Sequence, residues 1–292
     1  MRPIPGPKKT IITLTSAALL MAAVPQAIAS AQNTSQAAVK PCRAVVLTGH
    51  RGRVVKYDEN TVHAFVDAAK HHADSIEGDI SLTKPFGGQR PRFMLMHDQK
   101  VNRTTNGTGY IRDMTWKQVR ALRTQDDIAS TKDGDKVPFV GEILDAVKHR
   151  GVSLRLEIKH SPYWNDAVWN ELIQLFKHKG MVRRTLLYTF SSGYLHRIKD
   201  AAQRAGVHIR TAWKAHEPVT VAKVKKTSAN GVVPRPGDLT RKLVRHLHAA
   251  GLTVHGPQTD SRRTWAHQIH VLKVDTVITN RLDKYNKWCR NR

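Results

Sequence analysis

Residues 44–81 read AVVLTGHRGRVVKYDENTVHAFVDAAKHHADSIEGDIS. This stretch opens with an apolar, β-branched run at Ala44–Thr48, continues with a helical pattern at Thr61–His71 and returns to a β-rich run at Ser75–Ser81. A strand, a helix and a second strand in this order are typical of a unit whose two strands lie parallel in one sheet. The stretch therefore predicts an α/β fold.

The same alternation continues to the end of the chain. Further strand candidates lie at Phe93–Met96, Val152–Ile158, Thr185–Thr189, His208–Ala212, Gly231–Pro234, Leu252–His255 and Thr276–Thr279. Further helix candidates lie at Phe139–His149, Ala167–Lys179, Gly193–Ala205, Leu239–Ala250 and Arg263–Leu272. Several helices end at a glycine before a strand, as at Gly151 and Gly251. Eight such units close into a (β/α)8 TIM barrel, which is the fold we expect.

One segment interrupts the alternation. Gln99–Val137 is rich in glycine, asparagine and aspartate and holds one short helical pattern near Thr115–Leu122. We interpret it as a small insertion after an early strand, within a barrel domain spanning 44–292. The sequence shows no internal repeat.

The N-terminus has the pattern of a secretory signal peptide over 1–31. A basic front precedes an apolar stretch from Ile11 to Val24, and small residues then offer cleavage near Ala29 or Ala31. The apolar stretch is shorter than the roughly 20 residues that a membrane span needs, although a retained amphipathic anchor is an alternative. We expect a secreted protein with no transmembrane span and a flexible lead-in over 32–43.

Composition narrows the possible partners. The chain has 292 residues, a formal charge of +25 and 40% apolar residues, so it can bury a core and attracts anions. Aromatic residues make up only 6%, and no zinc-finger pattern accompanies the basic residues, so we expect no specific nucleic-acid partner. An anionic substrate is compatible with this charge. The oligomeric state is not indicated.

Cys42 and Cys289 are the two cysteines of the chain, and they lie close to the two ends of the expected domain. Two cysteines cannot form a four-cysteine zinc site, but outside the cytosol they can form one disulfide. The first and last strands of a barrel are neighbours, so both cysteines would lie near its N-terminal rim if a helix or turn around Leu282–Trp288 carries the chain back. Two unpaired thiols are the alternative.

Polar side chains stand at the ends of four strand candidates, where barrel enzymes hold their catalytic groups. They are His50 and Arg51, Glu77 and Asp79, His97, and Glu157 and Lys159. Glu77 and Asp79 point to the same face of a strand because they are two residues apart. Carboxylates held together repel unless a cation lies between them, and oxygen ligands suit Ca²⁺ or Mg²⁺.

The remaining groups of this set suit phosphate chemistry. Histidine exchanges a proton near neutral pH, with an unperturbed pKa of about 6.5. Arginine binds phosphate as a fork and lysine binds it as a point charge. The combination predicts metal-assisted cleavage of a phosphate ester.

Ordered motifs extend this pattern along the chain. They are Gly49–Gly52, Glu59–Thr61, Glu77–Asp79, His97-Asp98, Arg103–Gly109 and, more weakly, Val137–Glu142, Glu157–Lys159 and Val277–Asn280. In this order they resemble the glycerophosphodiester phosphodiesterase family, in an exported bacterial form. The resemblance implies a metal-dependent barrel hydrolase that releases glycerol 3-phosphate from deacylated phospholipids.

The resemblance also implies a role for each motif residue. It makes His50 and His97 catalytic, Glu77, Asp79 and Glu157 ligands of a divalent cation, and Arg51 and Lys159 the phosphate-binding groups. Glu59 is expected either to cap the helix that starts near Thr61 or to take part at the metal site, as a support for the ligands or as a ligand itself.

The chain departs from the family pattern at two places. Thr83–Pro91 is longer and more basic than the usual hairpin, and Pro257–Asp260 replaces the usual Trp-Thr-x-Asn. The missing tryptophan belongs to the substrate pocket, so Trp213 is considered as its replacement. Two other functions therefore stay open: a phospholipase D-like or teichoic-acid-degrading phosphodiesterase of the same fold, and a non-catalytic polyanion-binding protein.

Overall fold

The computed structural model describes Cys42, residues 44–125 and residues 134–290. The expected signal peptide at 1–31 and all of the expected lead-in except Cys42 lie outside the described residues. No helix of the described part is long and apolar enough to cross a membrane.

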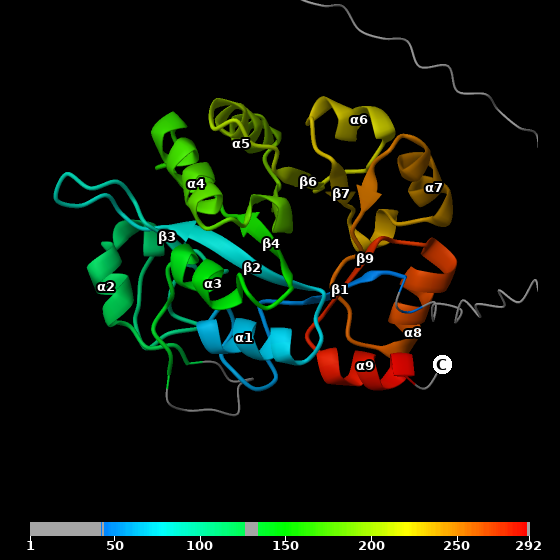
Figure 1. Cartoon of the computed structure of the whole chain (residues 1–292), viewed down its shortest axis with the longest axis horizontal. Coiled ribbons are helices and arrows are strands. Elements are labelled where there is room, and N and C mark those ends of the chain that lie inside the picture. The colour runs from blue at the N-terminus through cyan, green and yellow to red at the C-terminus, as the bar shows by residue number, and fades with distance from the viewer. Residues whose placement is uncertain (1–41, 43, 126–133, 291–292) are drawn as a thin grey trace, which may run out of the picture. The chain divides into compact units, whose positions relative to one another are not determined.

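In the described part of the chain, eight parallel strands form the wall of a barrel (Figure 1). They are β1 (Val46–Gly49), β2 (Ser75–Leu82), β4 (Ser153–Ile158), β5 (Thr185–Thr189), β6 (Arg210–Lys214), β7 (Gly231–Val233), β8 (Thr253–Val254) and β9 (Thr276–Thr279). Neighbouring strands pair in parallel from β9 through β1 to β8. A bridge between His255 and Thr276 and a 2.9 Å bond from Asp275 N to Val254 O close the ring between β8 and β9. The expected (β/α)8 barrel is confirmed.

Helices surround this wall and pack their apolar faces on its outer side. They are α1 (Val62–Lys70), α3 (Val140–Val147), α4 (Asp166–His178), α5 (Ser192–Arg204), α6 (Val221–Lys226), α7 (Arg241–Ala249), α8 (Arg262–Ala266) and α9 (Leu282–Arg290). Most begin at a Ser, Thr or Asn whose side chain accepts a backbone N–H of the first turn, as Thr61 does for α1. These caps fix the residue at which each of the capped helices begins.

Two helical segments differ from the sequence prediction. The lysine-rich α6 was not expected as a helix, because its few apolar residues give little periodicity over so short a run. The expected helix Arg263–Leu272 is α-helical only over α8 and continues as a π-helix over His267–Leu272. Lys273 then ends it in the left-handed region.

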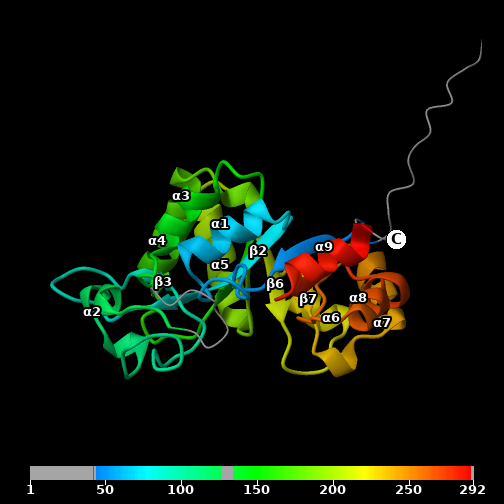
Figure 2. The same ribbon diagram turned by 90° about the horizontal axis from the view of Figure 1, so that it is seen from below.

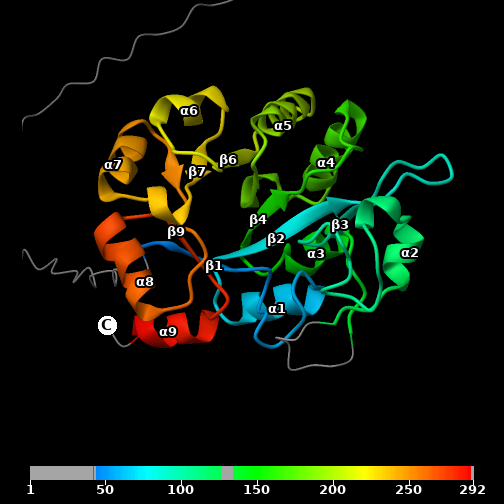
Figure 3. The same cartoon turned by 180° about the vertical axis from the view of Figure 1, so that it is seen from behind.

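One strand candidate is not part of the barrel wall. β3 (Phe93–Leu95) pairs antiparallel with the outer half of β2, with Ile80 opposite Leu95 (Figure 3). All eight residues of β2 are buried, so its far end is covered by the chain that folds back on it. The chain therefore returns toward the barrel along β3.

The segment after β3 carries a core of its own. It holds a 3-10 turn at Ile111–Asp113 and α2 (Trp116–Ala121), the expected short helix, which lies at one side of the barrel (Figure 2). The apolar side chains of this core are Met94 of β3 together with Met96, Val101, Ile111, Val119 and Val137. This packing holds the segment against the end of β2, next to the polar strand ends.

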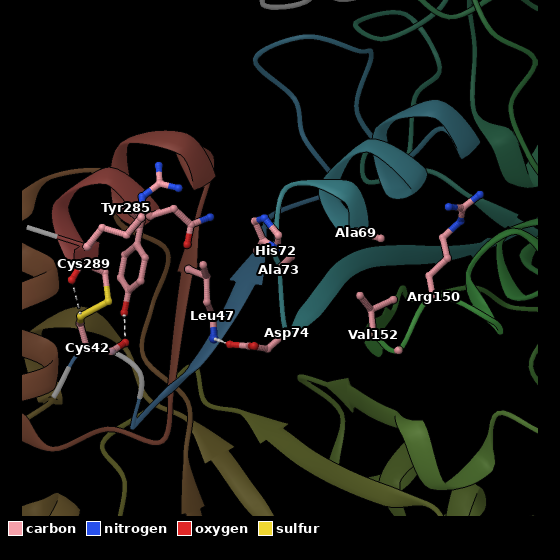
Figure 4. A pocket seen from close by; sticks show the side chains of 13 residues that line it. Cys42, Leu47, Ala69, His72, Ala73, Asp74, Arg150, Val152, Tyr285 and Cys289 are labelled. Atoms are coloured by element: carbon pink, nitrogen blue, oxygen red, sulfur yellow. Dashed lines mark hydrogen bonds between the residues drawn. A yellow bond between two sulfur atoms is a disulfide. The ribbon is translucent and has the colours of Figure 1, made fainter. Parts of the chain in front are cut away.

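A disulfide joins Cys42 and Cys289, as expected (Figure 4). α9 carries the chain back to the N-terminal rim, and Tyr285 Oη donates a 2.8 Å hydrogen bond to Cys42 O. The bridge therefore joins the two ends of the barrel domain on the N-terminal rim, opposite to the C-terminal strand ends that carry the polar residues.

Candidate active site

Three carboxylates meet inside the C-terminal rim. Glu77 and Asp79 point inward from β2, and Glu157 points inward from β4, where it stands opposite Asp79 in the strand register. All three are buried, and one carboxylate oxygen from each lies within 4.8 Å of the other two. Gly78 lies between the first two and faces α1, where a side chain would lie 2.6 Å from Phe65 Cζ. The spacing of two along β2 thus brings the carboxylates together, as expected.

Two lysines neutralise part of this charge. Lys159 Nζ lies 2.9 Å from both Asp79 Oδ1 and Glu157 Oε1. Lys214, from the end of β6, donates to Glu157 Oε2 at 2.6 Å. Glu157 is therefore held between two ammonium groups that both face the centre of the barrel.

The pKa values of the two carboxyl groups on β2 are shifted in opposite directions. Burial raises the pKa of the Glu77 carboxyl, and the Asp79 charge raises it further, although His50 and the Tyr188 hydroxyl act against this. Burial alone would also raise the pKa of Asp79, but Lys159, His97 and Arg51 hold it well below its usual range. A pair that resists full ionisation in this way is the arrangement that an additional cation stabilises.

His50 follows β1 and faces these carboxylates. Its Nε2 lies 3.8 Å from Glu77 Oε2, and its Nδ1 lies 2.8 Å from Asn280 Oδ1. Asn280 directly follows β9, which pairs with β1, so closure of the barrel brings together two residues 230 positions apart.

Arg51 is held in a strained backbone conformation beside Glu77. Its φ is 54°, in the left-handed region that non-glycine residues rarely adopt. In this conformation its backbone N–H donates to Glu77 Oε2 at 3.0 Å. Its guanidinium group donates a hydrogen bond to Glu59 and lies 3.6 Å from Asp79 Oδ2. Backbone strain of this kind concentrates at functional sites.

His97 reaches the site by a route that the sequence did not predict. It was expected at the end of a parallel strand, but it follows the antiparallel β3, where Met96 N donates to Asp79 O at 2.9 Å. Its Nδ1 lies 2.6 Å from Asp98 Oδ1. The Arg103 guanidinium bonds Asp98 and lowers the pKa of that carboxyl to about 2.

Glu59 links Arg51, which follows β1, to Arg103, which bonds the neighbour of His97, and it does not cap a helix. Thr61 is the cap of α1, while Glu59 accepts hydrogen bonds from Arg51 and Arg103. Burial would raise the pKa of Glu59, but the two arginines outweigh it and lower the pKa. Of the two expected roles, capping is wrong, because the Thr61 hydroxyl already occupies that position.

A sequence model of the glycerophosphoryl diester phosphodiesterase family matches residues 50–284. This range contains the seven site residues predicted from the sequence, which are His50, Arg51, Glu77, Asp79, His97, Glu157 and Lys159. The chain belongs to this family.

Individual relatives agree with the family match. The chain is 27% identical over 238 residues to the glycerophosphodiester phosphodiesterase of Bacillus altitudinis, covering 80% of this chain and 94% of that protein. It is 25% identical over 235 residues to that of Caldanaerobacter subterraneus, covering 80% and 93%.

Solved structures share the fold. The glycerophosphodiester phosphodiesterase of Agrobacterium tumefaciens has a TM-score of 0.69 at 22% identity, with 83% of this chain and 99% of that chain covered. A phosphodiesterase of Oleispira antarctica, solved with the product sn-glycerol-3-phosphate, has a TM-score of 0.67 at 16% identity, with 84% and 96% covered.

Three contacts of the candidate site were not predicted from the sequence. Tyr188 Oη donates to Glu77 Oε1 at 2.6 Å, Asn60 Nδ2 donates to Asp79 Oδ2 at 2.9 Å, and Lys214 bonds Glu157. Lys214 lies two residues beyond the expected end of its strand, on the same face as Ala212. Extending that strand by one period would have pointed to it.

Trp213 does not replace the missing pocket tryptophan of the family. It alternates with Lys214 along β6, so it points away from the barrel interior, and it is buried with its Nε1 bonded to Phe190 O. Phe190 is an exposed aromatic residue at the site: it is 45% exposed, and its ring centroid lies 4.7 Å from Lys214 Nζ. It lines a cavity of about 260 Å³ together with His50, Tyr188, Lys214, Arg235, Pro257 and Gln258.

A larger cavity of about 670 Å³ lies on the N-terminal rim of this family member, beside the disulfide (Figure 4). Its polar groups make structural bonds: Asp74 Oδ2 accepts Leu47 N–H at 2.8 Å, and Tyr285 bonds Cys42. None of the seven site residues predicted from the sequence lines it, whereas His50 lines the smaller cavity.

Proposed function

We propose that this family member hydrolyses glycerophosphodiesters to glycerol 3-phosphate and an alcohol, using Ca²⁺ or Mg²⁺, and that it acts as an exported enzyme. One observation carries the proposal: three buried carboxylates, two histidines, an arginine and a lysine converge at the C-terminal rim. The names of the curated relatives and the product bound to the Oleispira antarctica enzyme support the same reaction.

Glu77, Asp79 and Glu157 would hold the cation. Ca²⁺ lies 2.3–2.6 Å from its oxygen ligands, so two ligands of one ion can be up to about 5 Å apart. The distances of at most 4.8 Å between the carboxylate oxygens lie within this range. Both Ca²⁺ and Mg²⁺ prefer oxygen ligands, so the ligand type suits either ion. When bound, such an ion supplies positive charge that stabilises the phosphoryl group.

Arg51 and Lys159 are the groups proposed to bind the phosphate. The Lys159 side chain is 10% exposed and that of Arg51 is 16% exposed, and both are already oriented by bonds to carboxylates. Lys214 faces Glu157 from the other side and would add a third positive charge. Orientation before binding reduces the entropy that is lost when the phosphate binds.

His50 and His97 are proposed to move the protons. One removes a proton from the attacking group, either water or the neighbouring glycerol 2-hydroxyl, and the other gives a proton to the departing alkoxide. Asn280 and Asp98 orient these rings through their Nδ1 atoms. The alcohol side of the substrate would lie in the cavity beside Phe190 and Arg235.

Export rests on the N-terminal sequence and the disulfide. A signal peptide at 1–31, a lead-in at 32–43 and a barrel domain at 44–292 with an insertion at 99–137 form part of the proposal. The Cys42–Cys289 bridge supports it, because disulfides persist mainly outside the cytosol. No contact among the described residues favours a phospholipase D-like, teichoic-acid-degrading or non-catalytic polyanion-binding function over the diesterase.

A product assay tests the proposal. The purified protein is incubated with glycerophosphocholine, and glycerol 3-phosphate is measured before and after chelation and after return of Ca²⁺ or Mg²⁺. We expect activity that is lost on chelation and restored by a divalent ion, and that is abolished in His50→Ala and His97→Ala.

His196→Ala, on the exposed face of α5, is the matched control and should keep full activity. Circular dichroism checks that each variant is folded. Near-normal turnover in either site variant, or choline phosphate as the product, would contradict the proposal.

A further inference from the structure

Asp260, within the segment that departs from the family pattern, bonds the residue that holds His50. Its Oδ1 accepts the backbone N–H of Asn280 at 2.7 Å and the Thr279 hydroxyl at 2.8 Å. Its Oδ2 accepts Nδ2 of the Asn280 side chain at 3.0 Å and Gln258 Nε2 at 2.7 Å. Each carboxylate oxygen of Asp260 thus accepts two hydrogen bonds.

These bonds decide which way the Asn280 amide faces. An ionised carboxylate can only accept hydrogen bonds, so the part of the amide that faces Asp260 must be the NH₂ group. The carbonyl oxygen of Asn280 must then face His50 Nδ1, which lies 2.8 Å away. A carbonyl oxygen also only accepts, so His50 Nδ1 must carry a hydrogen.

The hydrogen on Nδ1 determines the state of Nε2, the other nitrogen of the His50 ring. A neutral imidazole carries one hydrogen, so with Nδ1 protonated the free lone pair is on Nε2. Nε2 is the nitrogen that faces the carboxylates, 3.8 Å from Glu77 Oε2.

We propose that Asp260 is a positioning residue that acts through Asn280 to keep the hydrogen of neutral His50 on Nδ1, so that Nε2 exchanges the proton with the substrate. The inference rests on the proposed function for the role of His50. It does not depend on whether His50 is the base or the acid, because both roles need Nε2 to face the reacting group.

Asp260→Asn separates this role from a simple loss of contacts. In that variant the new amide keeps its oxygen toward the Asn280 backbone N–H, which cannot turn away. Its NH₂ group then faces the NH₂ group of Asn280, and this contact is relieved when the Asn280 amide flips. The flipped amide donates to His50 Nδ1 and forces the ring hydrogen onto Nε2.

Two further variants sharpen the comparison. In the reciprocal double variant Asp260→Asn/Asn280→Asp, a carboxylate at position 280 accepts from both His50 Nδ1 and the amide at position 260, so the original tautomer returns. Thr279→Val removes one donor to the same carboxylate but leaves the Asn280 side chain untouched. It is the matched control for the stability that Asp260→Asn loses.

The experiment combines spectroscopy with kinetics on the full-length protein. Long-range ¹H–¹⁵N correlation spectra of ¹⁵N-histidine-labelled protein report the tautomer, and the His50 signals are identified by their loss in His50→Gln. Glycerol 3-phosphate release gives kcat and KM for the same samples. We expect the Nδ1–H tautomer in the wild type, Thr279→Val and the double variant, and the Nε2–H tautomer in Asp260→Asn.

Kinetically, we expect Asp260→Asn to lose about 10²–10⁴-fold in kcat with little change in KM, which is the range that acid–base catalysis contributes. The double variant should recover most of this loss. An Nε2–H tautomer in the wild type, or an unchanged tautomer in Asp260→Asn, would overturn the inference, and the wild-type spectrum tests it even if a variant does not fold. A changed tautomer with kcat equal to that of Thr279→Val would instead contradict the proposed catalytic role of His50.

Discussion

The Tyr188 hydroxyl donates a hydrogen bond of 2.6 Å to Glu77 Oε1 across the barrel interior. Tyr188 is on β5 and Glu77 is on β2, so the bond spans the strand β4 that lies between them in the sheet. It is one of two interactions that lower the pKa of Glu77 against burial and the Asp79 charge. The hydroxyl therefore favours the ionised form of this candidate metal ligand.

This bond predicts a pH shift in Tyr188→Phe. A carboxylate must lose its proton to bind a cation, so divalent affinity falls as the pH drops through the raised pKa of Glu77. Removing the hydroxyl raises that pKa further, so the loss of affinity should begin at a higher pH than in the wild type. Calorimetric titration of Ca²⁺ or Mg²⁺ at a series of pH values measures it, and a midpoint that is unchanged or lower would disprove the prediction.

Gly78→Ala should destabilise the fold and loosen the site. A Cβ at this position would lie 2.6 Å from Phe65 Cζ and 3.0 Å from Asn60 Oδ1, and Phe65 is fully buried. We expect a loss of about 1–3 kcal/mol in the free energy of unfolding, as for other overpacked cores, with weaker divalent binding because Asn60 bonds Asp79.

Urea unfolding measures this cost, with Gly141→Ala in α3 as the control. There the added Cβ has its nearest neighbour at 3.7 Å, and alanine favours a helix by about 0.5–1 kcal/mol over glycine. Equal stability in the two variants would show that the close approach at Gly78 has no energetic consequence.

Arg235→Gln should change the preference for the alcohol part of the substrate. Among the described residues that line the cavity beside Phe190 are Lys214 and Arg235 but no carboxylate; Asp238, which accepts hydrogen bonds from Arg235, lies outside the lining. We therefore expect a higher kcat/KM for glycerophosphodiesters with a neutral polyol or an anionic alcohol than for glycerophosphocholine. The variant should reduce this ratio a few-fold, because an exposed charge contributes about 0.2–1 kcal/mol.

Competition between the two substrates, followed by the alcohols released, measures the ratio directly. Arg245→Gln on α7 removes an exposed arginine that does not line the cavity and should leave the ratio unchanged. A preference for glycerophosphocholine in the wild type would refute the prediction.

The Cys42→Ser/Cys289→Ser double variant should melt at a lower temperature but turn over normally at moderate temperature. The bridge closes a loop with a sequence separation of 247 residues, and such a crosslink contributes about 2–5 kcal/mol. It lies on the rim opposite to the carboxylates, so kcat should not change. Calorimetry and the product assay on the same sample measure both, and lost activity in a folded variant would show that the bridge is more than structural.

The sequence alone determined the type of fold and most of the candidate site. Strand and helix periods are local properties of the chain, so the alternation of strands and helices predicted the barrel. The alternation of side chains along a strand placed Glu77 beside Asp79 and Glu157 two residues before Lys159. The cysteine pairing was also predictable, because the first and last strands of a closed barrel are neighbours.

Only the tertiary structure decided which distant residues complete the site. β3 runs antiparallel to β2, so His97 approaches from a fold-back that no local period distinguishes from a barrel strand. Tyr188 reaches Glu77 and Asn280 reaches His50 through the register of strands that are far apart in sequence. That register is set by the packing of all eight strands at once, and a one-residue slip would turn these side chains to the other face of the wall.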